Sequence, residues 1–181
     1  MSVSLMLATG TISLAFLLYT VAVFWERAAG RLRLPQLLLF WAGLVFDATG
    51  TTIMSGIAGT SAAGAADVVG MAVSAGAAGA AGGVNLHGVT GALAIVLMLF
   101  HAGWATYVYL RRDERRLASF HKLSISVWLV WTLPYAMGLL MGIPAIHMDG
   151  AMSAVHAGAV TVFLALLCVV TPAALRGRAT R

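Results

Sequence analysis

The sequence contains a single cysteine, Cys168, and very few charged residues. One cysteine excludes an intrachain disulfide and a cysteine-ligated metal cluster. Charged residues make up only 9% of the 181 positions, whereas hydrophobic residues make up 61%. A chain with so few polar side chains cannot cover a soluble domain of this size. The sequence therefore predicts an integral membrane protein, in which lipid takes the place of water around the apolar surface.

The sequence also lacks the short motifs that mark common enzyme classes. It has no GxSxG turn, no HExxH helix and no glycine-rich phosphate loop. These absences exclude the serine hydrolases, zinc hydrolases and nucleotide-binding enzymes that depend on such motifs. With no nucleotide-binding domain, a redox partner of this chain would be a quinone, a small oxidant or another protein.

The few basic residues are grouped rather than scattered. All 11 Lys and Arg residues fall into three clusters: Arg27, Arg31 and Arg33; Arg111, Arg112, Arg115, Arg116 and Lys122; and Arg176, Arg178 and Arg181. The positive-inside rule places all three clusters on the cytoplasmic side of a membrane. The net charge of +5 is thus explained by topology and does not indicate a nucleic-acid partner.

Five apolar stretches separate these clusters, and each is long enough to cross a bilayer. We expect helices over residues 3–25, 35–57, 86–110, 119–141 and 152–175. The predicted fold class is therefore all-α: one polytopic bundle of five transmembrane helices in the bacterial inner (cytoplasmic) membrane. Its N-terminus lies outside and its C-terminus lies in the cytoplasm. The first stretch has no basic residues before it and is too long for a cleaved signal, so we expect it to be retained.

Residues 59–84 are rich in Gly and Ala and are predicted to form an external loop. A membrane-spanning helix here would move the Arg111 cluster to the outside, so we reject that alternative. A second external loop, over residues 142–150, carries His147 and Asp149.

His87 and His101 are the most informative pair of residues. They lie 14 residues apart in one apolar stretch, which corresponds to a rise of about 21 Å and a net rotation of about −40° on a helix. Both rings therefore face nearly the same side, one near each membrane face. A helix that carries two haems across a bilayer needs this geometry, and an ionisable residue inside a membrane indicates function.

The depths of the five histidines predict two groups. His87, His147 and His156 lie toward the outside, and His101 and His121 lie toward the cytoplasm. Neutral imidazoles on facing helices suit the iron of b-type haem. We expect one or two haems, with His87 and His156 as the outer axial pair and His101 and His121 as the inner pair. The inner pair matches in depth only if the fourth helix begins near Glu114.

Other interpretations of these residues stay open. Arg111 and Arg112 would pair with haem propionates, or they serve only as topology anchors. The histidines would bind haem, carry protons without iron, or act only as hydrogen-bonded structural groups. Tyr135 follows His121 by 14 residues, where a symmetric di-haem bundle would place a second histidine.

Two acidic residues also lie in or beside the apolar stretches. Asp47 lies near the middle of the second helix, where a carboxylate must be protonated, hydrogen-bonded or paired. It would orient the His101 ring, accept a proton from a quinol, or be capped by neighbouring threonines for packing. Glu26 is followed by Arg27, and we expect the two to form a solvated pair at the membrane interface.

Several of these residues stand in stretches that resemble the HsmA family of small bacterial membrane proteins. The matching stretches are Phe24-Trp25-Glu26-Arg27, Val45-Phe46-Asp47, Leu86-His87-Gly88, Phe100-His101-Ala102 and Phe120-His121-Lys122. The resemblance covers about residues 5–142 and implies that Glu26, Asp47, His87, His101 and His121 form the polar set of the family. The loop over 59–84 and the fifth helix with His147 and His156 depart from it. The histidine layout is also loosely similar to cytochrome b561-type bundles.

The sequence as a whole predicts a b-type haem protein that transfers electrons across the membrane. In this hypothesis it is a cytochrome b-type oxidoreductase that exchanges electrons with quinone or with a partner protein of a respiratory or redox complex. Two alternatives remain. One is a cofactor-free accessory subunit of a larger membrane complex, suggested by its Ala- and Gly-rich surface. The other is a proton-coupled carrier that uses Asp47 and the histidines.

Overall fold

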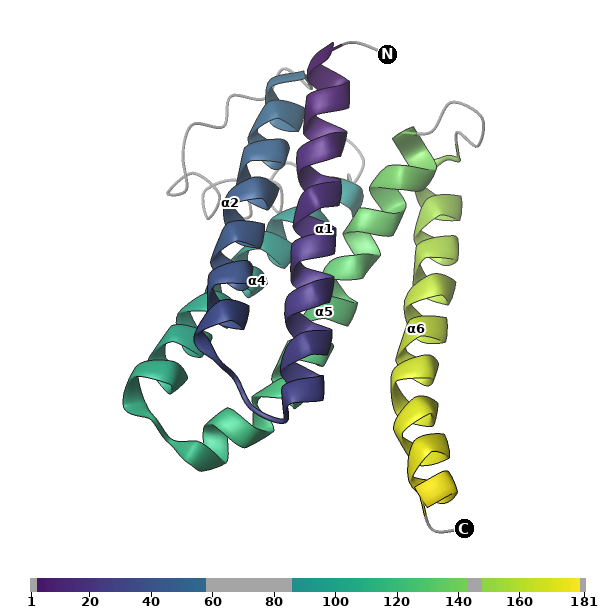
Figure 1. Cartoon of the computed structure of the whole chain (residues 1–181). Coiled ribbons are helices and arrows are strands. Elements are labelled where there is room, and N and C mark those ends of the chain that lie inside the picture. The colour runs from purple at the N-terminus through teal and green to yellow at the C-terminus, as the bar shows by residue number, and fades with distance from the viewer. Residues whose placement is uncertain (1–2, 58–85, 143–147, 180–181) are drawn as a thin grey trace.

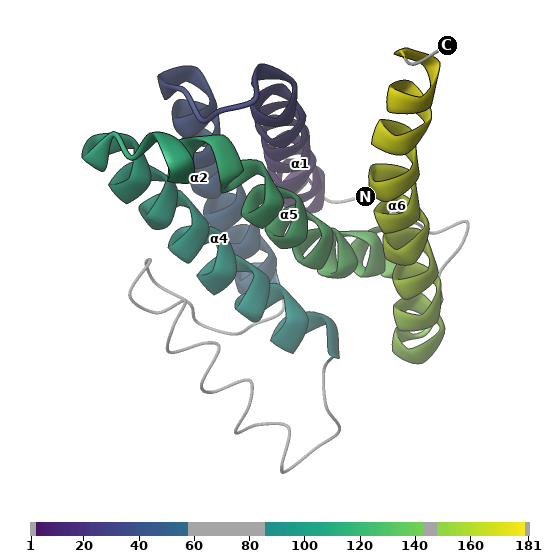
Figure 2. The same ribbon diagram turned by 90° about the horizontal axis from the view of Figure 1, so that it is seen from below.

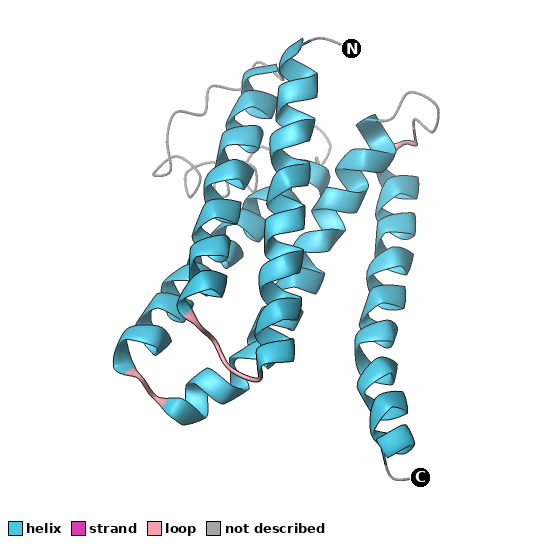
Figure 3. Cartoon of the chain, in the orientation of Figure 1, coloured by secondary structure: helices cyan, strands magenta, loops and turns pink. Residues whose placement is uncertain are grey.

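The computed structural model describes residues 3–57, 86–142 and 148–179, which are helical except for short turns (Figures 1 and 3). The helices are α1 (Val3–Ala29), α2 (Leu34–Ile57), α4 (Leu86–Arg111), α5 (Glu114–Gly142) and α6 (Gly150–Ala179). Each is long and apolar enough to cross a membrane. The prediction of five such helices is confirmed. The expected loop over residues 59–84 and His147 lie outside the described residues.

Helix α5 begins at Glu114, five residues before the predicted start at 119. Asp113 makes this early start stable, because its Oδ1 accepts hydrogen bonds from the backbone N–H groups of Arg115 and Arg116. Asp149 caps α6 in the same way by accepting from the N–H of Met152. The sequence prediction ended the helices where the apolar residues end, whereas capped polar turns extend them further.

The helices alternate in direction, so the basic residues gather at one end of the bundle. Helices α1, α4 and α6 end there, and α2 and α5 begin there (Figure 1). We call this the basic end. Gly30, with φ of 69°, turns the chain between α1 and α2. Leu32 N–H of that turn donates to the carbonyl of Leu117 in α5, at 3.1 Å, which ties the two turns together.

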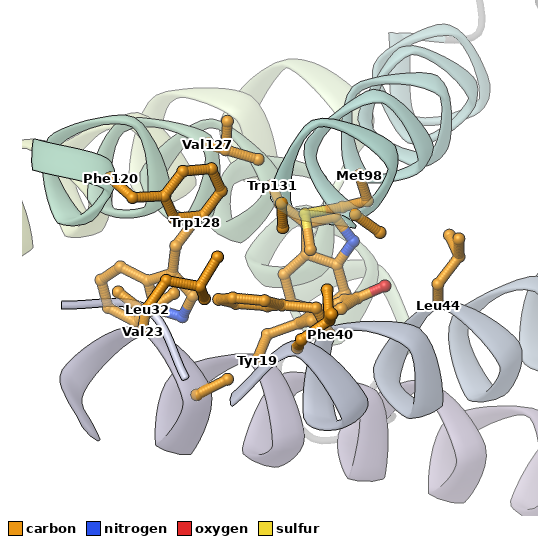
Figure 4. Packing of buried hydrophobic residues seen from close by; sticks show 14 of the residues in the cluster. Tyr19, Val23, Leu32, Phe40, Leu44, Met98, Phe120, Val127, Trp128 and Trp131 are labelled. Carbon is orange, nitrogen blue, oxygen red and sulfur yellow. The ribbon is translucent and has the colours of Figure 1, made fainter. Parts of the chain in front are cut away.

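The apolar core lies between the α1–α2 pair and the α4–α5 pair. Tyr19 and Phe40 from the first pair meet Met98 and Trp131 from the second (Figure 4). Helix α6 packs mainly on α5 and stands at the side of the bundle (Figures 1 and 2). The candidate site is therefore formed by α1, α2, α4 and α5.

Candidate functional site

Polar side chains in the bundle interior lie at three levels along α5. The levels are marked by Ser124, Trp131 and Gly138, which are seven residues apart. Seven residues correspond to a rise of about 10.5 Å and nearly two full turns, so the three positions share one face of α5. We call them the first, second and third layers, counted from the basic end. Buried ionisable residues inside a membrane are costly and indicate a functional site.

The first layer contains Glu26, His101 and Ser124, from α1, α4 and α5. Their exposed fractions are 0%, 1% and 0%. His101 Nε2 lies 3.1 Å from the Ser124 hydroxyl oxygen, and that hydroxyl also interacts with the Glu26 carboxyl. Neither carboxyl oxygen of Glu26 has a well-formed hydrogen bond, and His101 Nδ1 has none. The edge of Phe40 and the face of Phe120 enclose the His101 ring.

The second layer contains Asp47, Trp131 and Tyr19. Trp131 Nε1–H donates a hydrogen bond of 2.7 Å to Asp47 Oδ2, and Asp47 is only 3% exposed. The Tyr19 ring packs edge-on against Trp131, with centroids 5.2 Å apart. Its buried hydroxyl lies in the electrostatic range of Asp47 and has no hydrogen-bond partner. This layer joins α1, α2 and α5 at mid-membrane depth.

The third layer contains His87, which packs against Gly138. A Cβ atom added to Gly138 would lie 2.9 Å from His87 Cε1, so the glycine provides the space for the ring. His87 also interacts with the backbone carbonyl of Pro134, while its buried Nδ1 has no hydrogen-bond partner. His87 and His101 therefore both face α5, as their spacing predicts.

The remaining predicted site residues lie outside these layers. His156 is exposed on α6, and its Nδ1 is 2.8 Å from the carbonyl of Met152 in the preceding turn. His121 is half-buried in the second turn of α5. Arg111 stacks over Tyr107, and Arg112 is exposed in the turn between α4 and α5. Because α5 begins at Glu114, His121 lies only one turn from the Ser124 level.

Glu26 is the residue that sequence reasoning placed wrongly. The prediction of a solvated pair with Arg27 is wrong, because Glu26 is fully buried and Arg27 points away to α6. The Arg27 guanidinium donates to the carbonyl of Cys168, at 2.8 Å. The four-residue turn after α1 holds Glu26 on the inner face of the helix. The only sequence signal for its role was the family resemblance.

Asp47 also has a different partner from the one proposed. Its hydrogen bond goes to Trp131, whereas His101 contacts Ser124, one layer away. The hypothesis that Asp47 orients the His101 ring is therefore wrong.

The packing around His101 does not fit a haem. An axial ligand must present a free ring nitrogen to iron beside a flat macrocycle. Here Nε2 faces Ser124, and Phe40 and Phe120 occupy the space around the ring. Within residues 3–57, 86–142 and 148–179, no group of three or more His, Cys, Asp or Glu residues is arranged to hold a metal ion. We derive no step through haem from this arrangement.

Comparison with known proteins gives no significant match to a family model, to a curated protein or to a solved structure. The resemblance to the HsmA family stays a prediction.

Proposed function

We propose that the protein moves protons across the membrane as a proton-coupled carrier, with Asp47 as the central proton-binding group. The observation that carries this proposal is the stack of three polar layers along one face of α5. Each layer contains an ionisable side chain that is buried or nearly so: Glu26 and His101, then Asp47, then His87. In this proposal the basic end faces the bacterial cytoplasm, in agreement with the positive-inside rule.

Asp47 is suited to bind and release a proton without loss of structure. It lies 13 residues into α2, about 20 Å from the start of the helix. The indole N–H of Trp131 can only donate, so it holds Asp47 Oδ2 whether the carboxyl is charged or neutral. The second oxygen is then the one that carries the proton.

Transfer between layers requires an intermediate carrier. Direct proton transfer takes place over hydrogen-bond distances of about 2.6–3.2 Å, whereas the layers are about 10.5 Å apart. We propose that water enters between the layers during transport and completes the path. The unpartnered polar atoms on His101 Nδ1, Tyr19 Oη and His87 Nδ1 are the points at which such water would bind.

The test is proton flux into liposomes that contain the purified full-length protein and an internal pH dye. Wild-type vesicles should dissipate an imposed pH gradient much faster than empty vesicles. Asp47→Asn keeps an oxygen for Trp131 but cannot carry a proton, so flux should fall by about 10²-fold or more. Asp149→Asn is the matched control, because Asp149 is exposed and caps α6.

Wild-type vesicles that are no leakier than empty ones would contradict the proposal and favour the accessory-subunit hypothesis. Equal flux in wild type and Asp47→Asn would contradict the role of Asp47.

Electron transfer through b-type haem is a second proposal, supported by one observation. His87 and His101 face the same neighbour, α5, at a spacing of 14 residues. This proposal requires Ser124, Phe40 and Phe120 to move away from His101. It expects a coloured protein with a sharp reduced band near ~560 nm, whereas the proton pathway expects a colourless one.

A further inference from the structure

The first layer places a carboxyl group and an imidazole on two sides of one hydroxyl. Glu26, Ser124 and His101 come from three different helices and are all at most 1% exposed. His101 Nε2 lies 3.1 Å from the Ser124 oxygen, and the same oxygen interacts with the carboxyl of Glu26. The hydroxyl is therefore the only polar group shared by the two ionisable side chains.

This network has spare hydrogen-bonding capacity, which distinguishes it from a purely structural one. Buried polar groups are normally satisfied, and a network that only held helices together would be closed. Here both oxygens of Glu26 and Nδ1 of His101 lack well-formed partners. A serine hydroxyl has one hydrogen, so it can donate to the carboxylate or to the imidazole, but not to both at once.

The nearby cations are engaged elsewhere. Arg27, next to Glu26 in sequence, binds the Cys168 carbonyl on α6. Arg31 pairs with Glu114, 3.6 Å away at the exposed end of α5. On the other sides, α2 presents Phe40 and α5 presents Phe120 to the His101 ring. Among the groups described here, His101 is therefore the ionisable partner available to Glu26.

We propose that Ser124 relays a proton between Glu26 and His101, and that this trio is the proton-exchange site at the basic end. This inference rests on the proposed function, and it names the site where protons are loaded. In the inward step, the O–H bond of neutral Glu26 breaks and its proton goes to the Ser124 oxygen. The original Ser124 proton goes to His101 Nε2. The products are a Glu26 carboxylate and a His101 imidazolium, and Ser124 is unchanged.

Proton flux in liposomes tests the role of Ser124. Ser124→Ala removes the shared hydroxyl, so flux should fall at least about tenfold. Ser124→Thr keeps a hydroxyl and should restore most of the flux. Ser126→Ala is the matched control, because Ser126 is exposed on the same helix and bonds only the Lys122 carbonyl. Wild-type flux in Ser124→Ala would overturn the relay.

Infrared spectroscopy of the wild-type protein gives a readout that does not depend on transport. The carbonyl stretch of protonated Glu26, assigned by its loss in Glu26→Gln, should change together with the His101 ring bands in one pH titration. In Ser124→Ala the two should titrate separately. Unchanged coupling in Ser124→Ala would overturn the inference.

The two readouts separate this inference from the proposed function. If Asp47→Asn abolishes flux and Ser124→Ala does not, the relay is wrong and the carrier proposal stands. If wild-type vesicles show no flux but the two titrations are coupled through Ser124, the carrier proposal is wrong and the shared proton stands.

Discussion

At the scale of single residues, the hydrogen bond between Trp131 and Asp47 is the most consequential contact in the bundle. It joins α5 to α2 at 2.7 Å in a nearly fully buried environment. A buried carboxyl that loses its donor is left with an unmet desolvation cost. The contact therefore links the stability of the bundle to the group that we propose as the central proton carrier.

Trp131→Phe should lower both stability and flux. The lost hydrogen bond corresponds to about 0.6–2 kcal/mol in a membrane helix bundle, and Asp47 loses its fixed position. Thermal unfolding in detergent and flux in liposomes measure the two effects. Trp41→Phe is the control, because its indole bonds Thr106 on the exposed surface. Equal effects of the two substitutions would contradict a special role for the Trp131 contact.

Residue-level predictions from the sequence succeeded where the information was local. The spacing of His87 and His101 fixed their common face, because helix geometry alone decides it. The burial of Glu26 could not be predicted in the same way, because it depends on Ser124 and on the direction of Arg27. Its partner lies 98 positions further along the chain. The neighbouring Arg27 suggested a solvated pair, and a three-dimensional contact with α6 overrides that pattern.

At the scale of elements, α1 and α2 approach each other closely because glycines face the contact. A Cβ atom on Gly43 would clash with the ring of Tyr19, and one on Gly50 would lie 2.6 Å from Thr11 Oγ1. Small residues at helix contacts are a common means of association in membranes, where the hydrophobic effect does not separate helix from lipid. Gly43 also keeps Tyr19 in the second layer.

Gly43→Ala should destabilise the bundle by about 1–3 kcal/mol, because the added methyl group has no space. It should also reduce flux by displacing Tyr19 toward Trp131. Gly103→Ala should change stability by no more than about 0.5 kcal/mol, since no atom lies within 4 Å of the added Cβ. Unfolding in detergent measures both. A neutral Gly43→Ala would show that the α1–α2 contact can relax.

Helix α6 is attached to the rest of the bundle by an unusual backbone contact. Pro172 has no N–H, so the carbonyl of Cys168, four residues earlier, has no intrahelical donor. The Arg27 guanidinium donates to this carbonyl at 2.8 Å. The proline thus creates an acceptor in the helix that an arginine of α1 can use.

Arg27→Leu should loosen α6 and expose Cys168, which is the only cysteine of the chain and is half-buried. Its labelling by a small maleimide in detergent should therefore become faster. In Pro172→Ala the helix supplies its own donor, so adding Arg27→Leu should then change labelling much less. Arg31→Leu, which breaks only an exposed ion pair, is the control. Equal effects of Arg27→Leu in both backgrounds would contradict this account.

The number of helices was predictable, and their ends were not. Long apolar runs between basic clusters identify five helices directly. The start of α5 depends on Asp113, whose carboxylate caps a turn rich in arginine. Hydropathy assigns such a turn to a loop, whereas the cap and the helix dipole stabilise it as helix.

At the scale of the whole molecule, four helices enclose a column of polar layers and a fifth lies at the side. The layers follow a seven-residue period along α5 because antiparallel neighbours keep the same register over two turns. His101 and Ser124 are paired at one level, and His87 and Gly138 are paired 14 residues further along both helices. The same regularity sets Asp47 and Trp131 halfway between them.

The most direct measurement of the central claim is proton uptake by vesicles of the purified, colourless wild-type protein under an imposed membrane potential, interior negative. The account predicts acidification of the interior that reverses direction when the potential is reversed, and that is lost in Asp47→Asn. A wild-type protein that causes no acidification under either potential would contradict the claim that the polar layers form a proton path.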